Sequence, residues 1–283
     1  MICAGAVKPG KEPNPENFVL MAISKQSQMS VRIISKQNQA HGAFNGGQIV
    51  ENKPIGFPQD GGFVRPYSSL FYWARARAVI DSTIGLHPHQ GFEIMSFVMK
   101  GKIRHFDTKM NAWKELGEGG AQIIRAGNGI QHAEHMYRDS VMFQIWVDPD
   151  LDKTLQQEAS YDDYSVDSIP TEETKFGRIH HFAGAKGPMK LESDLEVIQK
   201  WEIERDMEME LPADHVLSAY VVSGNGRVNW LTIEQDDFIV IEEEGNLRIQ
   251  PTDDNLVVFA ILSPVEPGYK TYVRRMQERL HAG

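Results

Sequence analysis

The sequence predicts an all-β protein made of two copies of one barrel, followed by a short C-terminal helix. Three observations lead to this prediction. The chain has 283 residues, more than one compact domain usually contains. From about residue 30 it consists of short β-rich segments broken by Gly, Pro, Asn and Asp, which is typical of sandwiches and barrels rather than βαβ units. The order of these segments is similar in the two halves.

The expected strands of the first half are rich in β-branched and aromatic residues and end at turn residues. They cover residues 30–35, 70–80, 92–99, 121–124 and 141–147. A turn at Gly101 follows the third of these strands, and Asp148-Pro149-Asp150 ends the fifth. Residues 151–195 are polar and acidic, so we expect a connector with one or two strands.

The second half repeats this pattern. Its expected strands cover residues 216–222, 238–241, 247–249 and 256–262, and Gly224 takes the place of Gly101. Near the C-terminus, Val273, Met276 and Leu280 recur at helical spacing. We therefore expect a flexible N-terminal extension at 1–28, one barrel at 29–155, and a second barrel with the terminal helix at 156–283.

Composition limits the possible partners and the compartment. The formal net charge is -10, so direct nucleic-acid binding is not expected. The single cysteine, Cys3, excludes an intramolecular disulfide and fits a reducing compartment. The longest early apolar run, residues 18–23, is too short to span a membrane. We therefore expect a cytoplasmic protein without membrane contact.

Two pairs of residues carry the chemistry: His87 with His89, and His132 with Glu134. Each pair has i, i+2 spacing, which places both side chains on one face of a strand. Two such strands facing each other inside a barrel would bring three imidazoles and one carboxylate to one point. This donor set suits Fe, Mn, Ni, Cu or Zn and leaves coordination positions open.

Three segments carry a family resemblance: HPHQGFE at 87–93, IIRAGNGIQHAEH at 123–135 and FQIWVDPD at 143–150. They resemble the pirins of the cupin superfamily, specifically across about residues 60–150. Pirins are bicupins, so the resemblance implies two jelly-roll-type barrels with one metal site in the first. It also implies a ligand set of His87, His89, His132 and Glu134. The sequence departs from the pirin pattern at Gln90, where many pirins have Arg. Gly127 stands where the second cupin motif commonly has Pro, a change that pirins share.

Other polar residues near these motifs have alternative interpretations. Glu93 is the acidic residue of the general cupin motif, but we expect a supporting or structural role for it. His105 lines the cavity or lies on the barrel rim, and His135 points to the face opposite the ligands. In the second half, the positions that correspond to the first pair are Glu210 and Pro212, so no metal site is expected there.

The resemblance implies an enzyme of the quercetin 2,3-dioxygenase type. It would use one divalent transition metal, expected to be Fe(II), with Zn, Mn, Ni and Cu as alternatives. A flavonol or similar small aromatic substrate would bind through its 3-oxygen, and Glu134 would accept the proton before reaction with O2 opens the ring. Apolar side chains such as Met95 and Phe97 would hold the flat substrate.

A second hypothesis is a non-enzymatic metal or redox sensor that binds a protein partner such as a transcription regulator. The acidic surface is compatible with a basic partner. A third is a cupin isomerase or a binder of another small molecule. Neither the metal nor the oligomeric state follows from the sequence, because a site with three histidines and a glutamate accepts several first-row ions.

Overall fold

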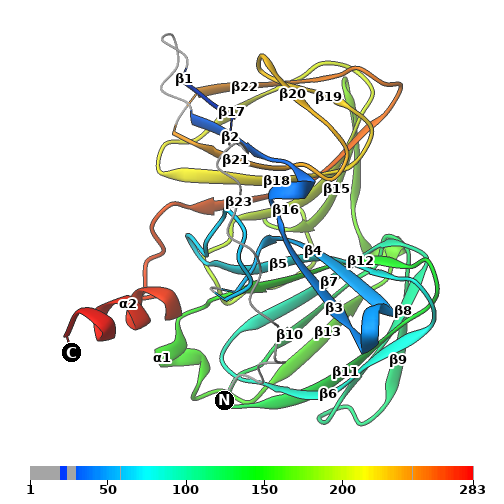
Figure 1. Cartoon of the computed structure of the whole chain (residues 1–283), viewed down its shortest axis with the longest axis vertical. Coiled ribbons are helices and arrows are strands. Elements are labelled where there is room, and N and C mark those ends of the chain that lie inside the picture. The colour runs from blue at the N-terminus through cyan, green and yellow to red at the C-terminus, as the bar shows by residue number, and fades with distance from the viewer. Residues whose placement is uncertain (1–19, 24–29, 58, 244, 283) are drawn as a thin grey trace. The chain divides into compact units, whose positions relative to one another are not determined.

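The computed structural model describes residues 20–23, 30–57, 59–243 and 245–282, and the chain divides into two compact units (Figure 1). Unit 1 contains residues 39–166 and the C-terminal segment from residue 269. Unit 2 contains the described residues up to 38 together with residues 167–268. Each unit is built from two antiparallel sheets.

Unit 1 combines a seven-stranded and a four-stranded sheet. The seven-stranded sheet has the order β13 (Ser160–Tyr164), β10 (Ala121–Arg125), β7 (Glu93–Lys100), β12 (Val141–Val147), β5 (Leu70–Ala78), β4 (Ile49–Ile55) and β3 (Ala40–Phe44). The four-stranded sheet has the order β6 (Ser82–His89), β11 (Ile130–Met136), β8 (Lys102–Asp107) and β9 (Trp113–Gly117). One apolar cluster of its interior includes Phe71 and Ile94, and another includes Val98 and Met142.

Unit 2 has the same kind of architecture. Its eight-stranded sheet has the order β1 (Leu20–Ile23), β2 (Ser30–Ile34), β21 (Phe238–Glu242), β18 (His215–Ser223), β23 (Leu256–Pro264), β16 (Val197–Ile203), β15 (Gly177–Ala183) and β14 (Thr171–Thr174). The four-stranded sheet has the order β17 (Met207–Leu211), β22 (Gly245–Pro251), β19 (Gly226–Val228) and β20 (Leu231–Ile233). One apolar cluster draws side chains from both sheets, among them Leu217, Ile239 and Leu247.

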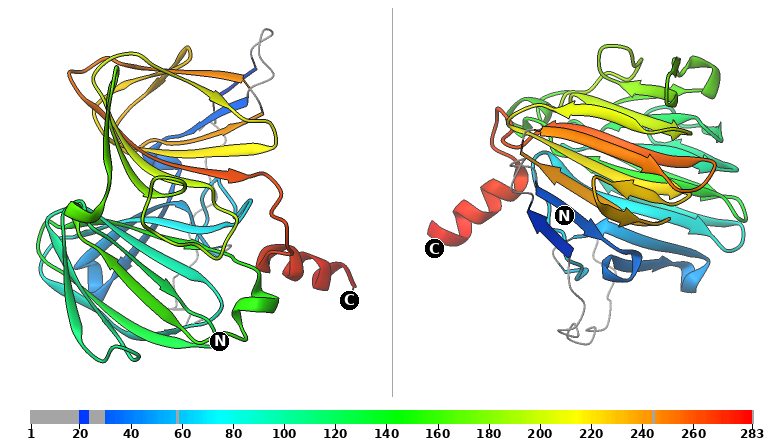
Figure 2. Two further views of the ribbon diagram at one scale, coloured as in Figure 1. Left: turned by 180° about the vertical axis from the view of Figure 1, so that it is seen from behind. Right: turned by 90° about the horizontal axis from the view of Figure 1, so that it is seen from above.

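The two α-helices both belong to unit 1. They are α1 (Leu151–Thr154) and α2 (Tyr272–Ala282), and the left view of Figure 2 shows them near each other. Arg275 on α2 pairs with Asp152 on α1 at 2.8 Å. The short 3-10 helices are Lys36–Asn38, Asn45–Gly47 and Val166–Ser168. Among the residues described, no helix is long and apolar enough to cross a bilayer.

The predicted fold class is confirmed, but the ends of the chain differ from the expected boundaries. Strand β2 pairs with β21 of unit 2, because Val31 and Ile33 join the apolar cluster of that unit. Helix α2 belongs to unit 1 rather than to the second barrel. Residues 20–23, expected to be flexible, form β1 and pair with β2. The rest of the predicted extension at 1–28 lies outside the described residues.

Gly127 shapes the loop that leads from β10 into β11. It has a positive φ of 50°, and its carbonyl oxygen accepts a hydrogen bond from the backbone N–H of Gly91 at 2.9 Å. A Cβ at this position would lie 2.6 Å from the carbonyl oxygen of Gln157 and 2.8 Å from the backbone nitrogen of Ala159. Backbone atoms cannot rotate away as a side chain can, so only glycine fits here.

Gly127→Ala is therefore expected to destabilise the protein by about 1–3 kcal/mol, since it combines an unfavourable φ with a backbone clash. Gly117→Ala is the control, because a Cβ there meets no atom within 4 Å. Urea unfolding followed by circular dichroism measures both variants. Equal unfolding midpoints for the two variants would show that the Gly127 loop adapts without strain.

Candidate metal centre

The two predicted residue pairs lie on neighbouring strands of one sheet. His87 and His89 are at the end of β6, and His132 and Glu134 are on β11. The strands pair antiparallel, with His132 opposite His87 and Ile130 opposite His89. The expectation that the two strands face each other across the barrel is therefore wrong. Direct cross-strand neighbours have Cβ atoms about 4.5–5.5 Å apart, which explains how the imidazoles meet.

The three imidazoles converge through their Nε2 atoms. His132 Nε2 lies 2.8 Å from His87 Nε2 and 2.8 Å from His89 Nε2. A ligand atom from each of the three residues lies within 4.8 Å of the other two. In the part of the chain that the structure describes, this is the one such group of His, Cys, Asp or Glu.

The protonation of these residues fits a metal ion. His87 Nδ1 lies 2.7 Å from the carbonyl oxygen of Gly85, so Nδ1–H donates there and Nε2 presents its lone pair. Burial, and then the neighbouring His87, lower the pKa of His89 to about 3. Burial, followed by His89 and His87, lowers the pKa of His132 well below its usual value. The neutral imidazole is the form that binds a metal ion, so the lowered pKa values of His89 and His132 favour binding through their converging nitrogens.

Glu134 lies beside this group with a buried side chain, and both of its carboxylate oxygens have donors. Oε1 accepts from Ser96 Oγ at 3.1 Å, and Oε2 accepts from Gln144 Nε2 at 2.5 Å. Glu134 is not part of the group whose ligand atoms lie within 4.8 Å of one another. The structure thus brings three of the four predicted ligands together, and the role of Glu134 as a fourth ligand stays a prediction.

A cavity of about 920 Å³ opens onto the site, and His87, His89 and Glu134 are among its lining residues. Aromatic rings form much of the wall, including those of Phe57, Tyr72, Phe92, Trp146 and Tyr272. Trp146 packs edge-to-face on His89, with ring centroids 4.7 Å apart.

The expectation that Met95 and Phe97 hold a substrate is wrong. Neither is among the lining residues, although both are fully buried. Their side chains alternate along β7 with those of Ile94, Ser96 and Val98, which lie on the opposite face. Ser96 contacts Glu134, so this opposite face is the one directed towards the site. The periodicity of an apolar strand shows which residues share a face, but it does not show which face lines the cavity.

The remaining candidates have structural partners. Glu93 is buried, with Oε1 3.9 Å from Arg125 Nε. His105, left open between cavity and rim, is buried, and its Nε2 lies 3.2 Å from Asp107 Oδ2. His135 Nδ1 lies 2.8 Å from the Thr83 hydroxyl. Gln90, at the departure from the pirin pattern, donates to the Asn128 carbonyl at 3.1 Å.

Three buried polar residues near Glu134 were missed by the sequence analysis: Ser96, Gln122 and Gln144. Each is an isolated polar residue within an otherwise apolar strand segment. That pattern was the available signal, because an uncharged polar side chain in a buried strand needs a hydrogen-bond partner.

Comparison with known proteins finds a family match in the segment that contains the site. The sequence model described as Pirin matches residues 63–147, which include all four predicted ligands. Over this segment the chain is similar to the pirin family. A pirin-like protein of Caulobacter vibrioides is 40% identical over 92 residues, 30% of this chain and 32% of that protein.

Longer matches relate this chain to named enzymes and to a solved metal complex. A quercetin 2,3-dioxygenase of Escherichia coli strain K12 is 25% identical over 215 residues, 72% of this chain and 89% of that protein. The crystal structure of an Escherichia coli pirin in complex with nickel(II) superimposes with a TM-score of 0.67 at 21% identity. The superposition covers 83% of this chain and 100% of the Escherichia coli protein, which shows that the two proteins share a fold.

The metal-free protein is expected to lose stability as the pH falls below neutrality. The pKa of His89 is about 3 in the folded chain against 6.5 as its ordinary value, so between these values only the unfolded chain takes up this proton. The free energy of unfolding is therefore highest above pH 6.5. Below pH 6.5 it falls by up to about 1.4 kcal/mol per pH unit for each proton that only the unfolded chain binds.

Urea unfolding of chelator-treated protein between pH 7 and pH 4.5 measures this slope. His89→Gln should flatten it, whereas the exposed His41→Gln should not. An identical pH slope in His89→Gln and in the unsubstituted protein would contradict the assignment.

Proposed function

We propose that this protein is a metal-dependent dioxygenase of the quercetin 2,3-dioxygenase type. Its substrates would be O2 and a flavonol or a similar small aromatic molecule. The observation that carries the proposal is the convergence of three imidazoles in an aromatic-lined cavity, next to a carboxylate that two donors hold in place. Relatives named quercetin 2,3-dioxygenase support the same chemistry.

The proposed ligands are His87, His89, His132 and Glu134, holding one divalent transition metal. We propose Fe(II) as the ion, because histidine and carboxylate ligands suit it and it can exchange electrons with O2. The nickel(II) complex of a related pirin is consistent with a donor set that accepts several first-row ions. When bound, such an ion acts as a Lewis acid that favours the deprotonated form of a coordinated hydroxyl group.

The chain's own residues would position the substrate and remove its proton. An ionised carboxylate is a hydrogen-bond acceptor only, so Glu134 can receive the proton of a substrate hydroxyl group. Ser96 and Gln144 fix the direction of that carboxylate. The rings of Phe57, Tyr72 and others around the cavity would hold a flat substrate and exclude water from the reacting atoms.

Glu134→Gln is expected to lower quercetin-dependent oxygen uptake about 10²–10⁴-fold, the usual contribution of a general base. The substituted amide keeps the size of the side chain but cannot accept the proton. Glu93→Gln is the matched control, since Glu93 pairs with Arg125, and its turnover should stay within a few-fold of the starting protein.

Metal analysis of the same preparations separates loss of chemistry from loss of the ion. Full activity in Glu134→Gln would exclude Glu134 as the base. If the metal-loaded starting protein took up no oxygen across a flavonoid panel and bound a protein partner in a redox-dependent way, the sensor hypothesis would replace the enzyme.

A further inference from the structure

A row of three polar residues crosses the interior face of the seven-stranded sheet in unit 1. Gln122 on β10 pairs with Ser96 on β7, and Ser96 pairs with Gln144 on β12. All three are buried, with 1%, 0% and 8% of their surfaces exposed. Ile94 and Val98, two residues to either side of Ser96, belong to apolar clusters. Buried polar groups are unfavourable without hydrogen bonds, so this row needs a specific reason.

The corresponding row in unit 2 is apolar. Ser96 lies five residues before the turn at Gly101, and Ala219 lies five residues before the turn at Gly224. Ala219 pairs with Ile239 and with Ala260, in the places that Gln122 and Gln144 take in unit 1. A barrel of this kind therefore does not require the polar row. Its presence is tied to the unit that contains the imidazole group.

A chain of hydrogen bonds leads from Asp107 to this row, and the bonds at Asp107 determine which atom donates at each later step. One oxygen of Asp107 accepts from the backbone N–H groups of Lys109 and Met110, at 2.8 and 2.7 Å. The other lies 3.2 Å from His105 Nε2, so that nitrogen carries the hydrogen and donates it. His105 Nδ1 is then an acceptor, and Gln122 Nε2 lies 3.3 Å from it.

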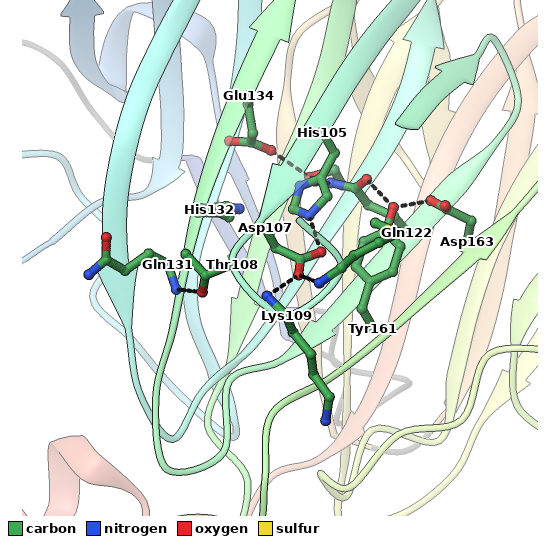
Figure 3. Close-up of polar contacts among 12 residues, drawn as sticks. His105, Asp107, Thr108, Lys109, Gln122, Gln131, His132, Glu134, Tyr161 and Asp163 are labelled. Carbon is green, nitrogen blue, oxygen red and sulfur yellow. Dashed lines mark hydrogen bonds and ion pairs between the residues drawn. The ribbon is translucent and has the colours of Figure 1, made fainter. Parts of the chain in front are cut away.

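The second amide hydrogen of Gln122 continues the chain towards Glu134. Gln122 Nε2 lies 3.3 Å from Ser96 Oγ, so the serine oxygen accepts from Gln122. The single hydroxyl hydrogen of Ser96 is then free to point to Glu134 Oε1, 3.1 Å away. Figure 3 shows His105 and Gln122 between the side chains of Glu134 and Tyr161, with Asp107 next to His105.

Tyr161 holds the outer end of this arrangement. Its ring stacks on His105 with centroids 4.8 Å apart and an interplanar angle of 9°. Its hydroxyl lies 3.3 Å from Gln122 Oε1 and also contacts Asp163. The nitrogen end of the Gln122 amide faces two acceptors, Ser96 Oγ and His105 Nδ1, and these two contacts fix the orientation of the amide.

We propose that Gln122 is a positioning residue for Glu134, acting through the hydroxyl group of Ser96. The Gln122 amide donates a hydrogen bond to the hydroxyl oxygen of Ser96. The hydroxyl hydrogen of Ser96 is therefore directed to Glu134, where it orients the carboxylate. Gln144 supplies the second donor from the opposite side of the row. This inference rests on the proposed function, in which Glu134 accepts the substrate proton.

The test compares Gln122→Glu, Ser96→Ala and the double variant. A carboxylate at position 122 cannot donate to Ser96, so the serine would turn its hydrogen away from Glu134. Each single variant is expected to lower kcat for quercetin about 10-fold, the effect of one charge-assisted hydrogen bond, with KM and metal content within twofold. The double variant should be no slower than Ser96→Ala, because both changes remove the same bond.

Gln199→Glu in unit 2 is the matched control. Gln199 Nε2 also lies near a histidine Nδ1, at 3.0 Å from His181, and Gln199 Oε1 also accepts from a donor, Trp201 Nε1. Its kcat should not change. If Gln122→Glu unfolds, Gln122→Met replaces it, and a smaller loss of kcat is expected because Ser96 can still donate to Glu134 but no longer has a donor that fixes its direction. Additive losses in the double variant would show that Gln122 acts independently of Ser96 and would overturn the proposal.

An infrared measurement tests the proposal without turnover. The carboxylate stretching band of Glu134 is identified as the band lost in Glu134→Gln, in difference spectra recorded on addition of Ni²⁺. Ser96→Ala and Gln122→Glu should shift this band in the same direction, and Gln199→Glu should leave it unchanged. An unshifted band in both variants refutes the positioning role. A shifted band in a protein that oxidises no flavonol supports the positioning role and refutes the proposed function instead.

Discussion

The pairing register of β6 with β11 is the constraint on which the site depends. His132 lies directly opposite His87, and this one pairing brings two of the converging Nε2 atoms within 2.8 Å of each other. Because side chains alternate along a strand, a slip of one residue would turn His132 to the other face. The apolar clusters on the interior face oppose such a slip, since it would also expose their members. The packing of the barrel therefore maintains the geometry of the imidazoles.

Sequence reasoning predicted the parts of this arrangement that depend on local spacing. The i, i+2 pairs did place His87 with His89 on one strand, and the Gly101 and Gly224 turns did mark equivalent points of the two barrels. Which strands pair is a long-range property, so the relation of β6 to β11 did not follow from the pattern. Nor did the pairing of β2 with β21, since an alternating strand fits several sheets.

The supporting residues around Glu134 were hidden for a different reason. Single Ser and Gln residues in apolar strands do not disturb hydrophobic periodicity, and nothing in the sequence shows that Ser96 lies between two glutamines. The comparison of the two units makes them visible. Unit 2 has apolar residues at the equivalent positions, Ala219, Ile239 and Ala260, whereas unit 1 has buried polar groups near its imidazoles.

The assignment of the two chain ends to units affects how the cavity can form. Tyr272, from the last helix, is part of the wall of the cavity in unit 1, while β2, near the start, is a strand of unit 2. Each unit is therefore assembled from separate segments of the chain, with part of the other unit between them. During synthesis, the earlier strands of unit 1 leave the ribosome long before Tyr272 does, so the cavity reaches its final shape only after Tyr272 has joined its wall.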